Sequence, residues 1–285
     1  MTRKSLLYFA LVGLLWGIPY LLMKVAVEDF PPAAVVAGRT LIGASILIPI
    51  AIYRKKFGRA VLGFKYVAFY ALMEMIGPWI LITTAEQKIN SGLAGLLVST
   101  VPIFATIITS LRGDHSVWQF KRILGIVVGF IGLILVVGIE SLSGNSDPLS
   151  IAMVIVASMG YAYAVIMVTT NLLLVDGIAI NGLAMAITTV FWAPVAIAQW
   201  PSSISMNSAL SLIALGIFST ALAFILFFKV IAEIGPARSS LVTYLNTAIA
   251  VLLGVIILRE PLTVGIVVGL PLVLVGSYLA SRKTA

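Results

Sequence analysis

The chain has 285 residues, of which 61% are hydrophobic and 10% charged, with no cysteine and a formal net charge of +8. Because soluble domains carry about 25% charged residues, this composition excludes a soluble globular protein, and the lack of cysteine excludes disulfides and thiolate metal sites. The basic residues form short clusters between apolar runs, which argues against a nucleic-acid partner.

Ten apolar runs follow one another along the chain, and each is long enough to cross a bilayer as a helix of about 20 residues. In the first half they cover 5–27, 32–53, 61–84, 90–111 and 121–139. In the second half they cover 149–171, 177–200, 208–232, 236–258 and 262–281. Each run is continuously apolar and does not alternate apolar with polar residues, as the strands of a membrane barrel would. A helix satisfies all backbone hydrogen bonds within its own segment, so the runs are predicted to be helices. We predict an all-α membrane protein with ten transmembrane helices.

The distribution of Lys and Arg predicts the orientation of these helices. If the N-terminus is cytoplasmic, 14 of the 18 basic residues fall at the inner face, as the positive-inside rule requires. Both termini are then expected in the cytoplasm, with membrane lipid around the bundle. Lys24 and Glu86 lie near the outer interface, where we expect both side chains to be solvated.

A short repeat indicates an internal duplication. The pentapeptide Gly-Ile-Val-Val-Gly occurs at 125–129 and again at 265–269. We therefore predict two five-helix repeats, 1–140 and 148–285. An odd number of helices inverts the second copy in the membrane, an arrangement common in secondary transporters. The alternative is coincidence, since Gly-x-x-x-Gly is a frequent packing motif of membrane helices.

Several motifs in this order resemble those of one transporter family. They are Leu15-Trp16-Gly17, Arg39, the segment 91–95 followed by Pro102, and Arg259-Glu260-Pro-Leu-Thr263. The chain is similar to the EamA-like ten-helix exporters of the drug/metabolite transporter (DMT) superfamily, and most like the YddG-type amino-acid exporters of the bacterial inner membrane. The resemblance implies a multi-pass inner-membrane protein without a cofactor. It also implies export of amino acids, aromatic or other neutral ones, or of related small metabolites, by alternating access.

Aromatic and polar residues near the middle of the membrane are candidates for a substrate cavity. Counting about 1.5 Å per residue places side chains of helices one, four, six and nine at similar depths. Rings together with an amide and a Pro-weakened helix could hold an amphipathic small molecule. The alternative for each aromatic residue is simple packing. The cavity candidates are Trp16, Glu74, Trp79, Pro102, Tyr161, Tyr163, Tyr244 and Asn246.

Glu74 is the one acidic residue deep within a predicted span, and an uncompensated charge there costs on the order of 3 kcal/mol. Arg39 of helix two lies at about the same level. Glu74 and Arg39 are therefore candidates either for ion or substrate coupling or for a structural ion pair, and the sequence leaves both open. The segment Gly77-Pro78-Trp79 is expected to interrupt helix three.

Motifs of other function classes are missing from the sequence. It contains no phosphate-binding Gly-x-x-x-x-Gly-Lys-Ser/Thr loop, no Gly-x-Ser-x-Gly elbow and no His-Glu-x-x-His pair, so we predict no enzyme, no catalytic residue and no metal site. A passive facilitator or uniporter and a multidrug exporter of the same fold remain alternatives. The oligomeric state is open, because the glycines at 13–17 and 125–129 can pack within one bundle or between two, and a monomer is compatible with both motifs.

Overall fold

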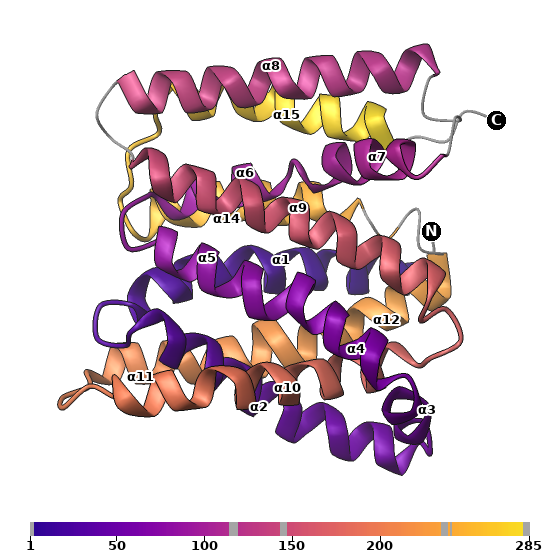
Figure 1. Ribbon diagram of the computed structural model, residues 1–285. Coiled ribbons are helices and arrows are strands. Elements are labelled where there is room, and N and C mark those ends of the chain that lie inside the picture. Colours follow the sequence, from indigo (N-terminus) through magenta and orange to yellow (C-terminus); the bar gives the residue numbers. More distant parts are fainter. Residues whose placement is uncertain (1–2, 114–118, 143–146, 235–238, 240, 282–285) are drawn as a thin grey trace.

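The computed structural model describes residues 3–113, 119–142, 147–234, 239 and 241–281. The regular secondary structure of this part is helical. The helices run side by side along one direction, and α1 begins at the same end of the bundle at which α15 ends (Figure 1). Within the described residues, seven helical segments are long and apolar enough to cross a membrane, and shorter apolar helices accompany them.

The first half contains five spans, two of which are composite. The spans are α1 (Arg3–Ala26), α2 (Pro32–Tyr53), the set α4 (Phe64–Ala71), η1 (Leu72–Ile76) and α5 (Gly77–Ala85), the pair α6 (Ser91–Val98) and α7 (Val101–Leu111), and α8 (Phe120–Leu142). A short helix, α3 (Phe57–Leu62), precedes the third span, which therefore begins after Gly63 and not at residue 61 as predicted.

The second half repeats this order. Its helices are α9 (Pro148–Thr170), α10 (Gly177–Ala198), the set α11 (Met206–Ala214), η3 (Leu215–Leu222) and α12 (Ala223–Ile234), α14 (Val242–Ile256) and α15 (Val264–Ser281). For the predicted run at 236–258 the structure describes α14, from Val242 on, and residues 236–238 and 240 of that run lie outside the described part. The other boundaries agree within a few residues.

Polar caps fix several helix starts. The Asp147 carboxylate accepts a hydrogen bond from the Ser150 amide at the start of α9 (3.0 Å), and Asp176 accepts from Ile178 and Ala179 at the start of α10. Ser205 caps α11 in the same way. These side chains satisfy amides that the first turn of a helix leaves unpaired, so each span starts at a defined residue.

Glycines allow some helices to approach closely. A side chain at Gly276 of α15 would meet the backbone of Gly125 and Gly129, so α8 and α15 are in backbone contact there. Gly13 and Gly17 of α1 similarly face Leu245 and Ile249 of α14. Both glycine motifs identified in the sequence are thus used inside this bundle. Small residues at membrane helix interfaces gain van der Waals contact in this way.

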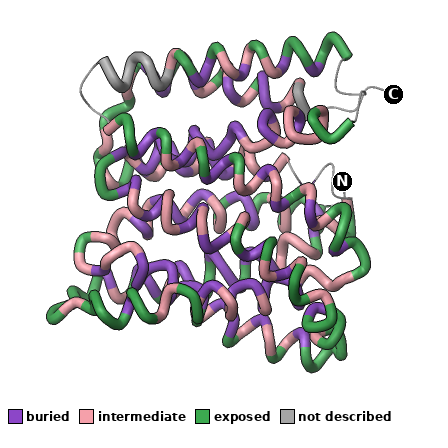
Figure 2. Tube along the Cα trace, viewed as in Figure 1, coloured by how far each residue is buried: buried purple, intermediate pink, exposed green. Residues whose placement is uncertain are grey.

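Many large apolar side chains lie on the outer surface of the bundle, where Figure 2 shows exposed residues along the helices. Val190 is 73% exposed and Ile197 74%, both on α10. The opposite side of the same helix is buried, with Ala184 and Met185 inaccessible. Large apolar side chains along whole exposed helix faces are what lipid requires of a spanning helix.

Both third helices contain a π-helical segment. In the first half η1 separates α4 from α5, and in the second half η3 separates α11 from α12. The carbonyl of Ile76, at the end of η1, accepts a hydrogen bond from the Trp192 indole (3.1 Å). Segments of this kind are rare and frequently lie at functional sites.

Candidate functional site

Arg39 lies at the centre of a buried polar cluster. Its guanidinium carbon lies 3.9 Å from the centroid of the Trp79 ring, and its Nη2 and Nε atoms donate to the Thr220 hydroxyl at 3.1 and 3.3 Å. The Nη1 atom faces the sulfur of Met23 at 3.6 Å. Stacking on a tryptophan face and a shared acceptor both stabilise a buried guanidinium. Helices α1, α2, α5 and η3 therefore meet at this one cation.

Glu74 and Arg39 do not form the ion pair that their depths suggested. The ion pair found among the described residues joins Lys88 to Asp147, at 3.7 Å. The electrostatic partners of Tyr161 include Glu74, Arg39 and Tyr20, so Tyr161 lies near both the carboxylate and the guanidinium. The structural ion pair is wrong, because Arg39 stacks on Trp79 and binds Thr220 instead.

Tyr161 also marks the boundary between the two main hydrophobic clusters of the bundle, since its ring packs against both. One cluster contains Tyr70, Trp79 and Phe224, and the other contains Tyr20 and Ile82. The polar groups of Arg39, Glu74 and Tyr161 thus lie where two apolar regions meet. An arrangement of a few polar groups against aromatic walls is typical of small-molecule sites.

The fourth span is broken next to Pro102. Residues 99 and 100 lie between α6 and α7, and the Ser99 carbonyl accepts a hydrogen bond from Ser277 of α15 (2.8 Å). Upstream in α6, the Leu97 carbonyl accepts from Ser158 of α9 (3.2 Å). A break in a membrane helix needs such partners, because lipid offers none. Pro102 follows the break and its side chain is half-buried.

The other predicted cavity residues lie at different places. Trp16 packs against Phe224 and Phe227 of the eighth span, with ring centroids 5.6 and 4.6 Å away. Asn246 of α14 is buried, and its side-chain oxygen accepts a hydrogen bond from Thr247.

Tyr163 and Tyr244 are held outside the polar cluster. Tyr163 contacts Phe69 and the Arg112 guanidinium at the end of α7. Tyr244 contacts Tyr278 of α15. The structure therefore brings together Glu74, Trp79, Tyr161 and Arg39, and it places Trp16 at the edge of the same apolar cluster as Trp79.

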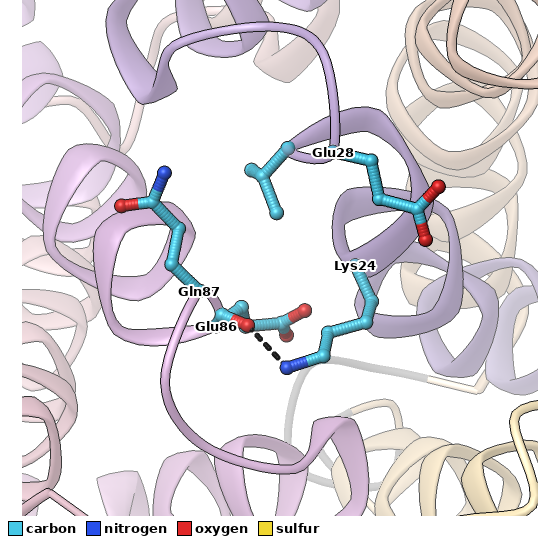
Figure 3. A pocket seen from close by; sticks show the side chains of 5 residues that line it. Lys24, Glu28, Glu86 and Gln87 are labelled. Atoms are coloured by element: carbon cyan, nitrogen blue, oxygen red, sulfur yellow. Dashed lines mark hydrogen bonds between the residues drawn. The ribbon is translucent and has the colours of Figure 1, made fainter.

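A pocket of about 220 Å³ lies at the end of the bundle where α1 and α5 finish (Figure 3). Its lining residues are Lys24, Val27, Glu28, Glu86 and Gln87. We refer to this end as the Lys24 end. The Lys24 ammonium donates to the backbone carbonyls of Glu86 (2.6 Å) and Ile89 (2.9 Å). It therefore ties α1 to the connection between α5 and α6.

Glu86 was expected in water, and that expectation is wrong. Its side chain is fully buried, and neither carboxylate oxygen has a hydrogen-bond partner among the described residues. Lys24 and Glu86 lie at the same depth near the ends of helices one and three, and this shared depth is the sequence signal that could have linked them. What it could not show is that Lys24 binds backbone carbonyls and leaves the carboxylate unpaired.

Glu260 makes a second polar contact at the Lys24 end. The chain turns at Arg259, whose φ of 55° is left-handed, and the Glu260 amide donates to the Gly254 carbonyl (3.0 Å). The Glu260 carboxylate then accepts from the Ser91 amide and hydroxyl, each at 2.8 Å. A carboxylate at a helix N-terminus is favoured by the unpaired amides and the helix dipole, so this contact fixes the start of α6.

A metal centre finds no support in this part of the chain, because no group of three His, Cys, Asp or Glu side chains is close enough to hold an ion among the described residues. The fold and the cluster define a multi-pass helical membrane protein with a polar centre.

Comparison with known proteins names the family. Residues 3–138 and 148–282 each match the model of the EamA-like transporter family, so the chain belongs to that family and is a membrane transporter. It is 27% identical to the uncharacterized transporter YoaV of Bacillus subtilis, over 97% of this chain and 96% of that protein. It is 26% identical to the uncharacterized inner membrane transporter YedA of Escherichia coli K12, over 95% and 90%. A solved crystal structure superposes with a TM-score of 0.66 over 98% of both chains at 16% identity.

Proposed function

We propose that this transporter carries neutral amino acids, aromatic ones among them, or related small metabolites, and that the Arg39 cluster is its substrate site. The observation that carries the proposal is the cluster itself, in which the buried guanidinium of Arg39 and the buried ring of Trp79 lie near the half-buried side chains of Tyr161 and Glu74. A zwitterion with an apolar side chain needs these partners: Arg39 for its carboxylate, Glu74 for its ammonium and Trp79 or Tyr161 for its side chain.

A further polar group of the eighth span supports a ligand at this place. Ser219 precedes Thr220 in η3, is 1% exposed and has a hydroxyl without a hydrogen-bond partner among the described residues. Buried polar atoms are nearly always satisfied. A bound solute that supplies the missing partner would account for this exception.

Alternating access between two inverted repeats is the proposed mechanism. The helix contacts pair equivalent elements of the two halves: the second spans α2 and α10 pack together, and the fifth spans α8 and α15 do so too. The first span of each half packs on the fourth of the other, α1 on α14 and α9 on α6 and α7. The π-helical segments occupy the third span of both halves. A pseudo-twofold relation predicts each of these pairings.

We propose the orientation that the basic residues indicate, with both termini in the cytoplasm and the Lys24 end outside. The membrane is proposed to be the bacterial inner membrane, as the printed name of the relative YedA states for that protein. Export would be driven by a proton gradient, with Glu74 as the coupling carboxylate.

The test uses purified protein in liposomes and a panel of labelled amino acids, nucleosides and cationic drugs. We expect neutral amino acids to exchange, and their methyl esters to compete at least about tenfold less well, because an ester gives Arg39 no charged partner. If no amino acid exchanges while drugs do, the cargo is wrong and the chain is a multidrug exporter.

Coupling is tested separately with Glu74→Gln and the matched control Glu28→Gln, which removes an exposed acid at the Lys24 end. We expect E74Q to lose accumulation driven by an imposed proton gradient and to keep exchange without a gradient, and E28Q to keep both. Wild-type transport that is unchanged by an imposed proton gradient would identify a passive facilitator.

A further inference from the structure

Glu86 is a fully buried acidic residue whose carboxylate makes no hydrogen bond within the described part of the chain. Both carboxylate oxygens are inaccessible and unpartnered among the described residues, although the residue lines the pocket at the Lys24 end (Figure 3). By contrast, Glu260 accepts three hydrogen bonds at the start of α6. A buried carboxylate without donors is costly in its ionised form and much less so when protonated.

The charged neighbours of Glu86 come from each element packed around it. Lys24 of α1 and Arg39 of α2 favour its negative charge, and Glu260 of the α14–α15 connection opposes it. The hydroxyl of Tyr20, also on α1, interacts electrostatically with Glu86 and Arg39. The cations and the acid partly offset each other, so the charge state of Glu86 can respond to the pH of the adjoining water.

The ammonium of Lys24 is too firmly placed to neutralise Glu86 directly. It donates to two backbone carbonyls, at 2.6 and 2.9 Å, and no ion pair within 4.0 Å joins it to an acid among the described residues. Ionised Glu86 nevertheless lies close enough to attract Lys24. Loss of that charge would weaken the hold of Lys24 on the α5–α6 connection, because the lysine would then be retained by neutral carbonyls alone.

We propose that Glu86 is a proton-binding site at the Lys24 end, and that its ionised form strengthens the contact by which Lys24 ties α1 to the α5–α6 connection. The ligand is a proton from the water of the pocket, and the step forms one O–H bond on the carboxylate and breaks none in the protein. Protonation weakens the contact between α1 and the connection, and so favours opening of this end. The site deepens the proposed transport function, because it would let external protons control the opening of this end.

The first experiment observes the proton without a transported solute. Infrared difference spectra of purified protein in nanodiscs, recorded between about pH 5 and about pH 9, report the carbonyl stretch of carboxyl groups that titrate above the ordinary range of glutamate, near pH 4.3. We expect such a band in the wild type and in Glu28→Gln, which changes an exposed acid of the same pocket. We expect Glu86→Gln to lose a component of it. A spectrum identical in E86Q and the wild type overturns the proposal.

The second experiment observes the opening of the pocket. Because the chain contains no cysteine, Val27→Cys supplies a single thiol in the pocket lining, and Ser203→Cys supplies an exposed reference in the α10–α11 connection. The ratio of their reaction rates with a polar maleimide cancels the titration of the thiol itself. We expect this ratio to rise severalfold as the pH falls in the wild-type background. In the E86Q background it should be high at every pH.

Lys24→Met separates the two parts of the proposal and guards against a variant that misfolds. It should abolish the pH dependence of the labelling ratio while keeping the infrared band, because Glu86 is still present. A pH-dependent ratio that persists in E86Q or in K24M refutes the link between proton and contact. Neither readout uses a substrate, so failure of these tests leaves the substrate site standing, and failure of the liposome panel leaves Glu86 unaffected.

Discussion

The contact between α8 and α15 makes a sharp prediction about Gly276. A Cβ atom built at this residue would lie 2.7 Å from the carbonyl oxygen of Gly125 and closer still to the backbone of Gly129. Ordinary carbon contacts lie at about 3.5 Å or more, so Gly276→Ala must push the two helices apart by about 1 Å. The neighbouring atoms are backbone, which cannot move aside as a flexible side chain does. Overpacking of this kind costs about 1–3 kcal/mol.

The measurement is reversible unfolding of the purified protein in mixed micelles with increasing dodecyl sulfate. G276A should shift the folding equilibrium constant by roughly 5- to 150-fold toward the unfolded state. The matched control is Gly58→Ala in α3, where the added methyl would meet nothing within 4 Å, and its effect should stay within about 0.5 kcal/mol. Equal stability of G276A and G58A would show that α8 and α15 do not touch along this line.

Two further predictions concern polar contacts. Thr220→Val removes the acceptor shared by two Arg39 nitrogens and should cost about 1.5–3 kcal/mol in the same unfolding assay. The control is Thr188→Val, which removes a hydroxyl that donates to a carbonyl of its own helix and should cost about 0.6 kcal/mol. Equal losses of stability in the two variants would contradict the Arg39 contact. The Ser150 hydroxyl and amide hold the pKa of Asp147 below its ordinary value, so the cap on α9 is fully present above about pH 4 and is lost as the pH falls further. Hydrogen exchange at the start of α9 should be slow at neutral pH, faster in strong acid, and fast at both in Asp147→Ala; unchanged exchange in that variant would refute the cap.

Hydropathy was sufficient to locate the helices, because lipid demands an uninterrupted apolar run for each crossing. The sequence predicted the interruption of one composite span but not that of the other. The interruption near Gly77 and Pro78 was expected, and a π-helical segment does precede Gly77. The break at 99–100 ahead of Pro102 depends on serine hydroxyls of α9 and α15, which donate hydrogen bonds to carbonyls at and just before the break. Those partners lie more than 50 residues away in the sequence, so local pattern could not reveal them.

The membrane depth of the candidate residues was predicted from the sequence, but the contacts between their side chains were not. The helical rise placed Arg39 and Glu74 at one level, and Tyr161 does lie near both. The partner of a buried guanidinium depends on which acceptor and which ring the tertiary fold presents, and Thr220 comes from the other half of the chain. Glu86 was missed for a related reason: its position near a span end predicts solvation, and only packing of α1 against it excludes water.

The π-helical segment η1 also sets the rotational register of the third span. Tyr70 and Trp79 are nine residues apart, and at about 100° per residue an unbroken α-helix would point them about 180° away from each other. Both are nonetheless buried in the same hydrophobic cluster, at 5% and 6% exposure. An extra residue absorbed by η1 shortens the effective separation to eight, or about 80°. A plain helix through this segment would have turned either Tyr70, which binds Asn181, or Trp79, which carries Arg39, toward lipid.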